Sequence, residues 1–354
     1  MKISKFPWVV QKEILRRMNL IELVFMSFCS RKLREFVVNM IKWKSSQLET
    51  IFYHWHSPDY TRVASTYKGE EFSFLKIKVK PEIGDRIPIK MNFIEMDLQC
   101  CMPTESEDFL ICCGEGEIET ILQTIHNFFL SWIGSNIKYE LTSYKYIPRV
   151  PNITSSQLWL LDKKTAASQL TSFLSYSPVP EFLCLIVISG YTNYEEIPGL
   201  AETLVLYCWT GGKADILLSN FKGRELYVYK AELNDSTVIK FLNDWKSSNG
   251  YRNLKYVNVI VDESFELHPD MIMSQCSLKT FDSMEKFPVY HYKQRYQIHP
   301  IMFHSFKFSS QYYIVRESDG YVASFKVQSN SMFFTAWNMN EKDFLEKHAN
   351  NMFQ

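Results

Sequence analysis

The sequence predicts a mixed α+β / α/β protein, with N-terminal helices, a domain of repeated strand–helix units and a C-terminal β-hairpin region. Over the first 46 residues, apolar side chains recur at helical spacing. The second half instead alternates short β-branched runs with helical patterns. The composition is 46% hydrophobic, 22% charged and 15% aromatic. These proportions are typical of a globular chain with a filled core.

Three short helices are predicted between residues 1 and 46. The first would start after Pro7, and the second after Asn19, where Glu22 completes a capping box. Ser30 can cap the third. The first helix carries an apolar stripe at every fourth residue: Val10, Ile14 and Met18. So short a segment cannot bury a core of its own. Either it packs on the rest of the chain, or another polypeptide covers it.

The same stretch resembles the F-box motif over about residues 4–46. The resemblance is carried by Phe6-Pro7, Ile14-Leu15, a Glu22-Leu23 helix start and the polar corner at residues 30–32. It implies a three-helix domain at 1–46 that docks on a Skp-family adaptor and through it on a cullin. Carried over residue by residue, the adaptor-binding positions are Phe6, Pro7, Ile14, Leu15, Leu23 and Phe28.

Charge is unevenly distributed in a chain whose formal net charge is zero. Residues 1–50 contain ten Lys or Arg and four Glu, so this segment carries +6 and the remainder −6. One cluster holds five of these bases: Arg16, Arg17, Arg31, Lys32 and Arg34. The segment lacks both aromatic interleaving and a helix with polar base-reading residues, so we expect no nucleic acid partner. A charged rim around a protein interface is the favoured interpretation.

Residues 47–180 are predicted to form a mixed strand and helix region. A linker is expected near residues 44–60, followed by strands at 72–80 and 109–113 and a helix at 116–134. His54 and His56 have the spacing of two side chains on one strand face, with Asp59 nearby. Metal sites usually need further ligands, so a linker pair without metal is the favoured interpretation.

Residues 181–285 are predicted to form the core of the second half. Strands are expected at 183–188, 203–208, 225–229, 254–261 and 278–281. Between two of them lies a helix face, capped by Asn234 or Ser236: Val238, Phe241, Leu242 and Trp245. Strand–helix alternation at this period indicates parallel βαβ units or a leucine-rich-like stack.

Residues 221–261 resemble the core of the type 2 F-box-associated domain of a large nematode family, in which a Phe-x-Gly-x-x-Leu strand precedes a helix ending in Trp. Residues 312–327, within the 286–354 region, resemble that family's terminal hairpin. Its turn would use Asp319 and Gly320 at positive φ. Together with the F-box, the resemblance implies a substrate receptor of a Skp–cullin–F-box ubiquitin ligase, whose C-terminal domain binds an unknown protein target.

No catalytic, metal-binding or cofactor-binding motif was found. The sequence lacks GxSxG, and the glycines of residues 210–213 lack a phosphate-loop frame. The cysteine doublets at 100–101 and 112–113 are interpreted as strand cysteines, with cross-strand pairing as the alternative. We expect no enzyme, no cofactor, no signal peptide and no membrane partner, and a cytoplasmic and/or nuclear protein. The rival interpretations are a ligase-independent interaction scaffold and an α/β enzyme with its site at the ends of parallel strands.

Overall fold

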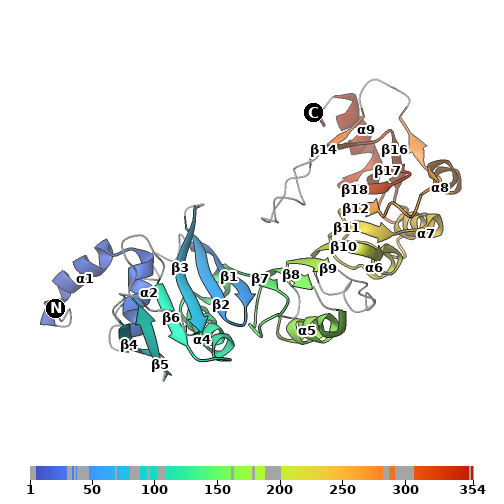
Figure 1. Ribbon diagram of the computed structural model, residues 1–354. Helices are drawn as coiled ribbons and strands as arrows, with labels where there is room; N and C mark the ends of the chain where they lie inside the picture. Colours follow the sequence, from blue (N-terminus) through green and yellow to red (C-terminus); the bar gives the residue numbers. More distant parts are fainter. Residues whose placement is uncertain are drawn as a thin grey trace. The chain divides into compact units, whose positions relative to one another are not determined.

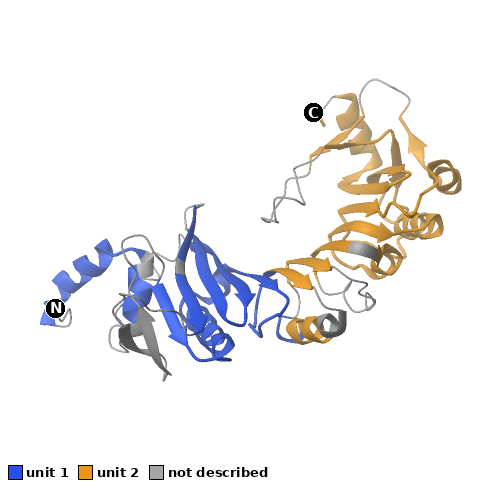
Figure 2. Ribbon diagram, in the orientation of Figure 1, with its two compact units in different colours: residues 1–155, 175–177 blue, residues 156–174, 178–354 orange. Residues whose placement is uncertain are grey.

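The computed structural model describes residues 5–29, 34–35, 37, 48–67, 70–79, 88–93, 96–101, 109–160, 163–177, 180–187, 201–281, 287–291, 307–350 and 352–353. The chain divides into two compact units (Figure 2). Unit 1 comprises residues 1–155 and 175–177, and unit 2 comprises residues 156–174 and 178–354. The four predicted domains are finer divisions than these units, and their boundaries stay predictions.

Within its described residues, unit 1 combines N-terminal helices with a mixed sheet on which a further helix packs. In chain order its elements are α1 Trp8–Arg17, α2 Leu20–Cys29, β1 Leu48–Ser57, β2 Tyr60–Tyr67, β3 Glu70–Val79, β4 Pro88–Phe93, β5 Met96–Cys101, β6 Phe109–Cys113, α4 Ile118–Ile133 and β7 Lys138–Tyr144 (Figure 1). The strand order is β7-β1-β2-β3-β6-β5-β4. β1 pairs with β2 antiparallel and with β7 parallel. The predicted strands at 72–80 and 109–113 and the helix at 116–134 are confirmed.

The linker predicted near residues 44–60 is wrong for its described part, because β1 occupies residues 48–57. Alternate side chains of this strand, Ile51, Tyr53 and Trp55, are buried. Period-two burial is the pattern of a strand with one core face. The two histidines lie on the opposite face, and their stacked rings are 6.3 Å apart.

His126 of α4 is completely buried in the core of unit 1. Its Nδ1 lies 2.9 Å from the Tyr53 hydroxyl, and its ring meets Tyr139 edge-on. Burial lowers the pKa of His126 to about 4, although the Pro151 backbone opposes this shift. Burial also lowers the pKa of His54 to about 4, assisted by the charge of Arg62. Both imidazoles are therefore neutral in the folded protein near pH 7.

Acidification is expected to destabilise unit 1. Because the folded pKa of His126 lies below its ordinary value of 6.5, the unfolded chain takes up the proton first as the pH falls. The contribution of neutral His126 to the free energy of unfolding is thus fully present above about pH 6.5. It is lost as the pH falls towards 4, by at most about 3 kcal/mol. Urea unfolding of the wild type and His126→Gln at about pH 7 and about pH 4.5 would measure this. An undiminished pH dependence in the variant would contradict the assignment.

Unit 2 contains a ladder of parallel strands with helices on one side and an antiparallel extension (Figure 1). Its elements are β8 Ser155–Leu160, α5 Lys163–Tyr176, β9 Phe182–Val187, β10 Thr203–Lys213, α6 Ala214–Asn220, β11 Glu225–Glu232, α7 Asp235–Lys246, β12 Tyr256–Val261, α8 Pro269–Gln275, β13 Lys279–Thr280, β14 Val289–His291, β15 Lys307–Ser309, β16 Tyr312–Val315, β17 Tyr321–Gln328, β18 Ser331–Asn340 and α9 Glu341–Ala349. The first residue of β8 and the last two of α5 fall in unit 1. The strand order is β13-β16-β17-β18-β12-β11-β10-β9-β8.

Strand and helix alternate from β10 to β12, where α6 and α7 lie between successive parallel strands. Strands β9 to β12 run parallel, and all six side chains of β9 are buried. Asn234, not Ser236, caps α7, since its side chain accepts from the Thr237 amide. The predicted strand at 278–281 shrinks to two residues. A leucine-rich-like organisation stays a prediction.

The hairpin at 312–327 is confirmed as β16 paired with β17, but its turn differs from the predicted one. Of the two predicted turn residues, Asp319 and Gly320, only Gly320 has positive φ, at 70°. The connection spans residues 316–320 instead of two residues. The guanidinium of Arg316, which is only 6% exposed, donates to both carboxylate oxygens of Asp319, at 3.0 and 2.6 Å. This clamp holds the longer loop in place of a tight turn.

Gly223 permits a close backbone approach at the start of β11. A β-carbon there would clash with the carbonyl oxygen of Ala201 and lie 2.7 Å from that of Glu202. The carbonyl of Glu202 also accepts from the amide of Arg224 at 2.6 Å, so the two segments cannot simply separate.

Gly223→Ala is expected to destabilise unit 2 by roughly 2 kcal/mol, since overpacking forces the backbone to shift. Gly250→Ala is the matched control, because a β-carbon at Gly250 meets no atom within 4 Å. Chemical denaturation of both variants would measure the difference, and equal stabilities would refute the steric argument.

Candidate functional site

The first candidate site is built on α1 and begins with a proline. The carbonyl of Pro7 accepts from the amides of Val10 and Gln11, at 3.0 and 3.1 Å, and starts the helix. The side chain of Gln11 also donates to the carbonyl of Phe6. Residues 5–17 carry four basic side chains against the single acid Glu13. The two at the C-terminal turn, Arg16 and Arg17, face the negative end of the helix dipole.

The predicted capping box of α2 is confirmed. The side chain of Asn19 accepts from the amide of Glu22 at 2.8 Å, and the carboxylate of Glu22 accepts from the amide of Asn19 at 2.7 Å. Two donors that the helix leaves unpaired are thereby satisfied. The short link between α1 and α2 is therefore determined locally, by residues 18–22.

The structure separates the predicted adaptor-binding residues into accessible and buried groups. Pro7 is exposed, and Phe6 and Ile14 are half-buried. Leu15 and Leu23 have no exposed surface. They are interior supports of the two helices, so substituting them would test folding before docking. The side chain of Phe28, like most of the predicted third helix, lies outside the described residues.

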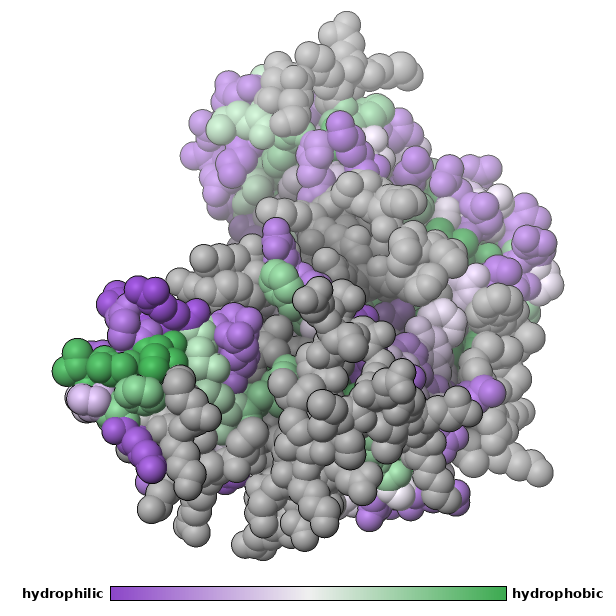
Figure 3. Space-filling view, turned by 60° about the vertical axis from the view of Figure 1, so that its left-hand side comes forward, coloured by the Kyte–Doolittle hydropathy of each residue, from purple (hydrophilic) through white to green (hydrophobic). Residues whose placement is uncertain are grey.

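Accessible apolar surface on α1 is concentrated at its first turn. Trp8 is 52% exposed, Val9 75% and Val10 42%. In Figure 3, where the side of the molecule that carries α1 comes forward, apolar residues border strongly hydrophilic ones. The sequence prediction missed Trp8 and Val9. The sequence does contain a signal, since three large apolar residues follow the helix-starting proline directly. A single apolar stripe that faces its own chain cannot bury three consecutive residues of a helix.

Helix α2, in contrast, packs within its own unit. The Phe25 ring stacks on the Phe109 ring of β6, with centroids 3.3 Å apart. Arg34 donates to the Ser27 carbonyl at 3.4 Å, and its guanidinium lies 5.5 Å from the centroid of Phe128 on α4. Arg34 thus packs internally instead of forming part of the predicted charged rim. Both sequence interpretations of the N-terminal segment hold in part, since α2 packs on its own chain and α1 exposes apolar residues.

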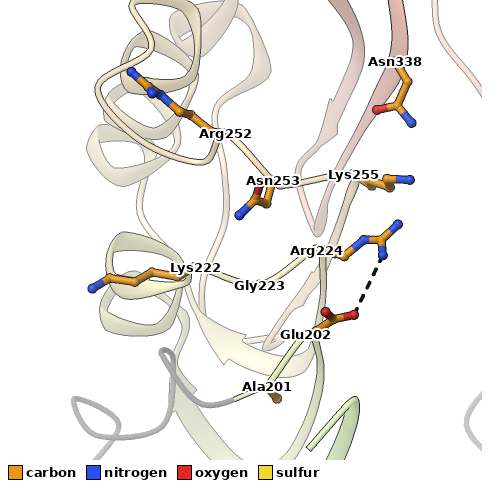
Figure 4. A pocket seen from close by; sticks show the side chains of 9 residues that line it. All are labelled: Ala201, Glu202, Lys222, Gly223, Arg224, Arg252, Asn253, Lys255 and Asn338. Carbon is orange, nitrogen blue, oxygen red and sulfur yellow. Dashed lines mark ion pairs between the residues drawn. The ribbon is translucent and has the colours of Figure 1, made fainter. Parts of the chain in front are cut away.

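The second candidate site is a pocket in unit 2 with a cavity of about 500 Å³. It lies where the parallel strands begin, because eight of its nine lining residues come from the segments before β10, β11 and β12, and Asn338 lies in β18. Its lining consists of Ala201, Glu202, Lys222, Gly223, Arg224, Arg252, Asn253, Lys255 and Asn338 (Figure 4). Four of these residues are basic and one is acidic. The pocket therefore has a local charge of +3 in a chain that is neutral overall.

Backbone hydrogen bonds tie the loops of this pocket together. The amide of Lys255 donates to the carbonyl of Arg224 at 2.7 Å, and the amide of Ala336 donates to the carbonyl of Lys255 at 2.9 Å. The carboxylate of Glu202 lies 3.8 Å from the guanidinium of Arg224. In Figure 4, Lys222 and Arg252 extend towards one side, and Arg224, Lys255 and Asn338 towards the other.

The described residues offer little for catalysis at the opposite ends of the parallel strands. Nδ1 of His268 lies 2.8 Å from the carboxylate of Asp235, but no described hydroxyl or thiol bonds its other ring nitrogen. In the register of β5 and β6, Cys100 lies opposite Ile111, so the cysteine doublets do not face each other. Within the described ranges, no group of three or more His, Cys, Asp or Glu side chains could hold a metal ion. No helix there is long and apolar enough to cross a membrane.

Comparison with known proteins assigns the N-terminal segment. The F-box domain family matches residues 3–45, which include α1, α2 and the capped link between them. No curated protein and no solved structure matches the chain. The protein therefore carries an F-box domain. This domain implies a role as a Skp-binding adaptor in Skp–cullin–F-box ubiquitin ligases, since F-box domains typically bind a Skp-family protein and through it a cullin.

Proposed function

We propose that this protein is the substrate-receptor subunit of a Skp–cullin–F-box ubiquitin ligase. The F-box helices dock on the adaptor, and unit 2 binds a target protein. The observation that carries the proposal is the F-box match at residues 3–45, which contains a first helix with an exposed apolar turn. Apolar anchors at the centre of an interface supply most of its affinity, and the surrounding basic residues speed encounter with an acidic partner.

The receptor performs no bond chemistry in this proposal. It raises the effective concentration of the target beside a ubiquitin-conjugating enzyme, so it is not itself an enzyme and uses no cofactor. The resemblance of residues 221–261 and 312–327 to the type 2 F-box-associated domain supports target binding by unit 2. The protein would act in the cytoplasm and/or nucleus, without binding nucleic acid or membrane.

A ligase-independent scaffold is the second candidate. It is favoured by the complete burial of Leu15 and Leu23, which withdraws two of the predicted contacts from any partner. Affinity purification of the full chain, with and without proteasome inhibition, separates the two. A ligase receptor co-purifies with adaptor and cullin, and its targets accumulate when the proteasome is inhibited. A scaffold retains its targets without adaptor or cullin, and that result would overturn the receptor proposal.

A further inference from the structure

We propose that the Asn249-Gly250 pair is a site of spontaneous deamidation, at which the protein acquires a carboxylate without the action of an enzyme. The pair lies between α7 and β12, and the sequence contains no second Asn-Gly step. Asn249 is exposed and Gly250 is half-buried. The inference is independent of the proposed function, because it depends only on the chemistry and the geometry of this loop.

Deamidation at such a pair proceeds through a cyclic imide. The backbone amide nitrogen of Gly250 loses its proton to a solvent base and attacks the side-chain carbonyl carbon of Asn249. A carbon–nitrogen bond forms, and the side-chain amide group leaves as ammonia. Water then opens the ring at one of its two carbonyl groups, which gives either aspartate or isoaspartate. Ring closure is easiest before glycine, because no β-carbon hinders the attacking nitrogen.

Both reacting groups are available in the folded protein. Among the described residues, the side chain of Asn249 has no hydrogen-bond partner, and no acceptor binds the amide of Gly250. The amide proton can therefore leave without the prior loss of a hydrogen bond. A β-carbon built at Gly250 would meet no atom within 4 Å, so there is also room beside the attacking nitrogen.

The backbone just before the pair is held in place by the end of α7. The amide of Ser248 donates to the carbonyl of Trp245 at 3.2 Å, and the amide of Asn249 donates to that of Asp244 at 2.9 Å. Ser248 has a positive φ of 65°. These features define a Schellman cap, with serine at the left-handed position that glycine usually occupies. The cap fixes the main chain of Asn249 and leaves its side chain free to turn towards Gly250.

The loop is also anchored after the pair, so a change in its length should matter. Tyr251 has a positive φ of 60°, and its hydroxyl donates to the carbonyl of Leu218 at 2.8 Å. The carbonyl of Arg252 accepts from the guanidinium of Arg316 at 3.3 Å. Isoaspartate would lengthen the main chain by one atom between these anchors and the cap at Ser248. We expect isoaspartate to loosen the loop, whereas aspartate only adds a negative charge.

The test incubates the full chain at neutral and at mildly alkaline pH and maps its asparagines by peptide mass spectrometry over several weeks. Deamidation appears as a gain of about one dalton. Asn234 and Asn340 are internal references, because their side chains cap α7 and α9 and accept from backbone amides. We expect Asn249 to react at least about fivefold faster than either reference. The rate should rise with pH, because the attacking nitrogen must lose its proton.

Two variants and a control locate the reaction. Gly250→Ala should slow it at least about tenfold, because a β-carbon hinders ring closure. The open space at Gly250 admits this β-carbon, so the variant should remain folded. Asn249→Asp supplies the aspartate product and should unfold at the same denaturant concentration as the wild type. The control, Lys240→Ala, changes an exposed side chain of α7 and should react as the wild type does.

A synthetic peptide of residues 245–253 shows that the incubation is long enough for an unconstrained pair to react. The inference is overturned if Asn249 stays intact while the peptide is modified, or if Asn234 or Asn340 reacts as fast as Asn249. It is also overturned if Gly250→Ala reacts at the wild-type rate. The isoaspartyl form is then separated and should unfold at a lower denaturant concentration than the unmodified chain. Equal midpoints would refute the predicted loosening of the loop.

Discussion

Trp8→Asp combined with Val9→Asp is expected to abolish capture of the Skp-family adaptor without unfolding the protein. Trp8 and Val9 are 52% and 75% exposed, so neither side chain belongs to the buried core of unit 1. Aspartate in the first turn also complements the helix dipole, so α1 should persist. Truncating anchor residues at an interface costs about 2 kcal/mol or more each, so affinity should fall at least about a hundredfold. Titration with purified adaptor measures the loss.

The matched control introduces the same change on exposed helical residues elsewhere. Met271 on α8 and Leu345 on α9 are 43% and 40% exposed, and both belong to unit 2. Met271→Asp with Leu345→Asp should leave adaptor affinity unchanged. If the α1 variant still binds normally while its circular dichroism matches the wild type, α1 is not the docking element. A scaffold role would then be favoured.

Arg316→Met is expected to destabilise unit 2 by about 3 kcal/mol, because charged hydrogen bonds and cation–π contacts are lost together. The guanidinium donates to both oxygens of Asp319 and to the carbonyl of Arg252. It also lies 5.1 Å from the ring centroid of Trp245 and 5.3 Å from that of Tyr321. Denaturant unfolding followed by tryptophan fluorescence measures the change.

The exposed pair Lys240–Asp244 on α7 provides the control for Arg316. Its atoms are 3.0 Å apart, but the lysine side chain is 68% exposed. Lys240→Met should therefore change stability by no more than about 0.5 kcal/mol. Arg316→Lys should show an intermediate loss, because an ammonium cannot form the two-fold contact. A loss for Arg316→Met as small as that of the control would refute the structural role.

Acid titration provides an independent check on the same clamp. Hydrogen bonds from Arg316 hold the pKa of Asp319 below its ordinary value of 3.8. A carboxylate with a lowered folded pKa stabilises the fold above its unfolded pKa, and this contribution is lost as the pH falls through the folded pKa. The loss of stability that accompanies protonation of Asp319 at acid pH should therefore be smaller in Arg316→Met. An identical acid profile would contradict the pairing.

Local patterns were sufficient for much of the secondary structure. The capping box at Asn19 and Glu22, the apolar face of α7 and the β-branched strands each depend on neighbours within a few residues. The β1 strand was missed although Pro58 and Asp59 supply a turn signal at its end and β2 follows as its antiparallel partner. On its other side β1 pairs with β7, about ninety residues away. No local rule contains that partner.

The candidate sites divide in the same way. The F-box could be found from sequence because capping and helix periodicity are short-range properties of residues 3–45. Which of its apolar residues remain exposed depended on packing, since Phe25 and Arg34 meet ring partners on β6 and α4. The basic pocket had no sequence signature at all. Its lysines and arginines come from loops about thirty residues apart, and only the parallel stacking of β10, β11 and β12 brings their charges to one cavity.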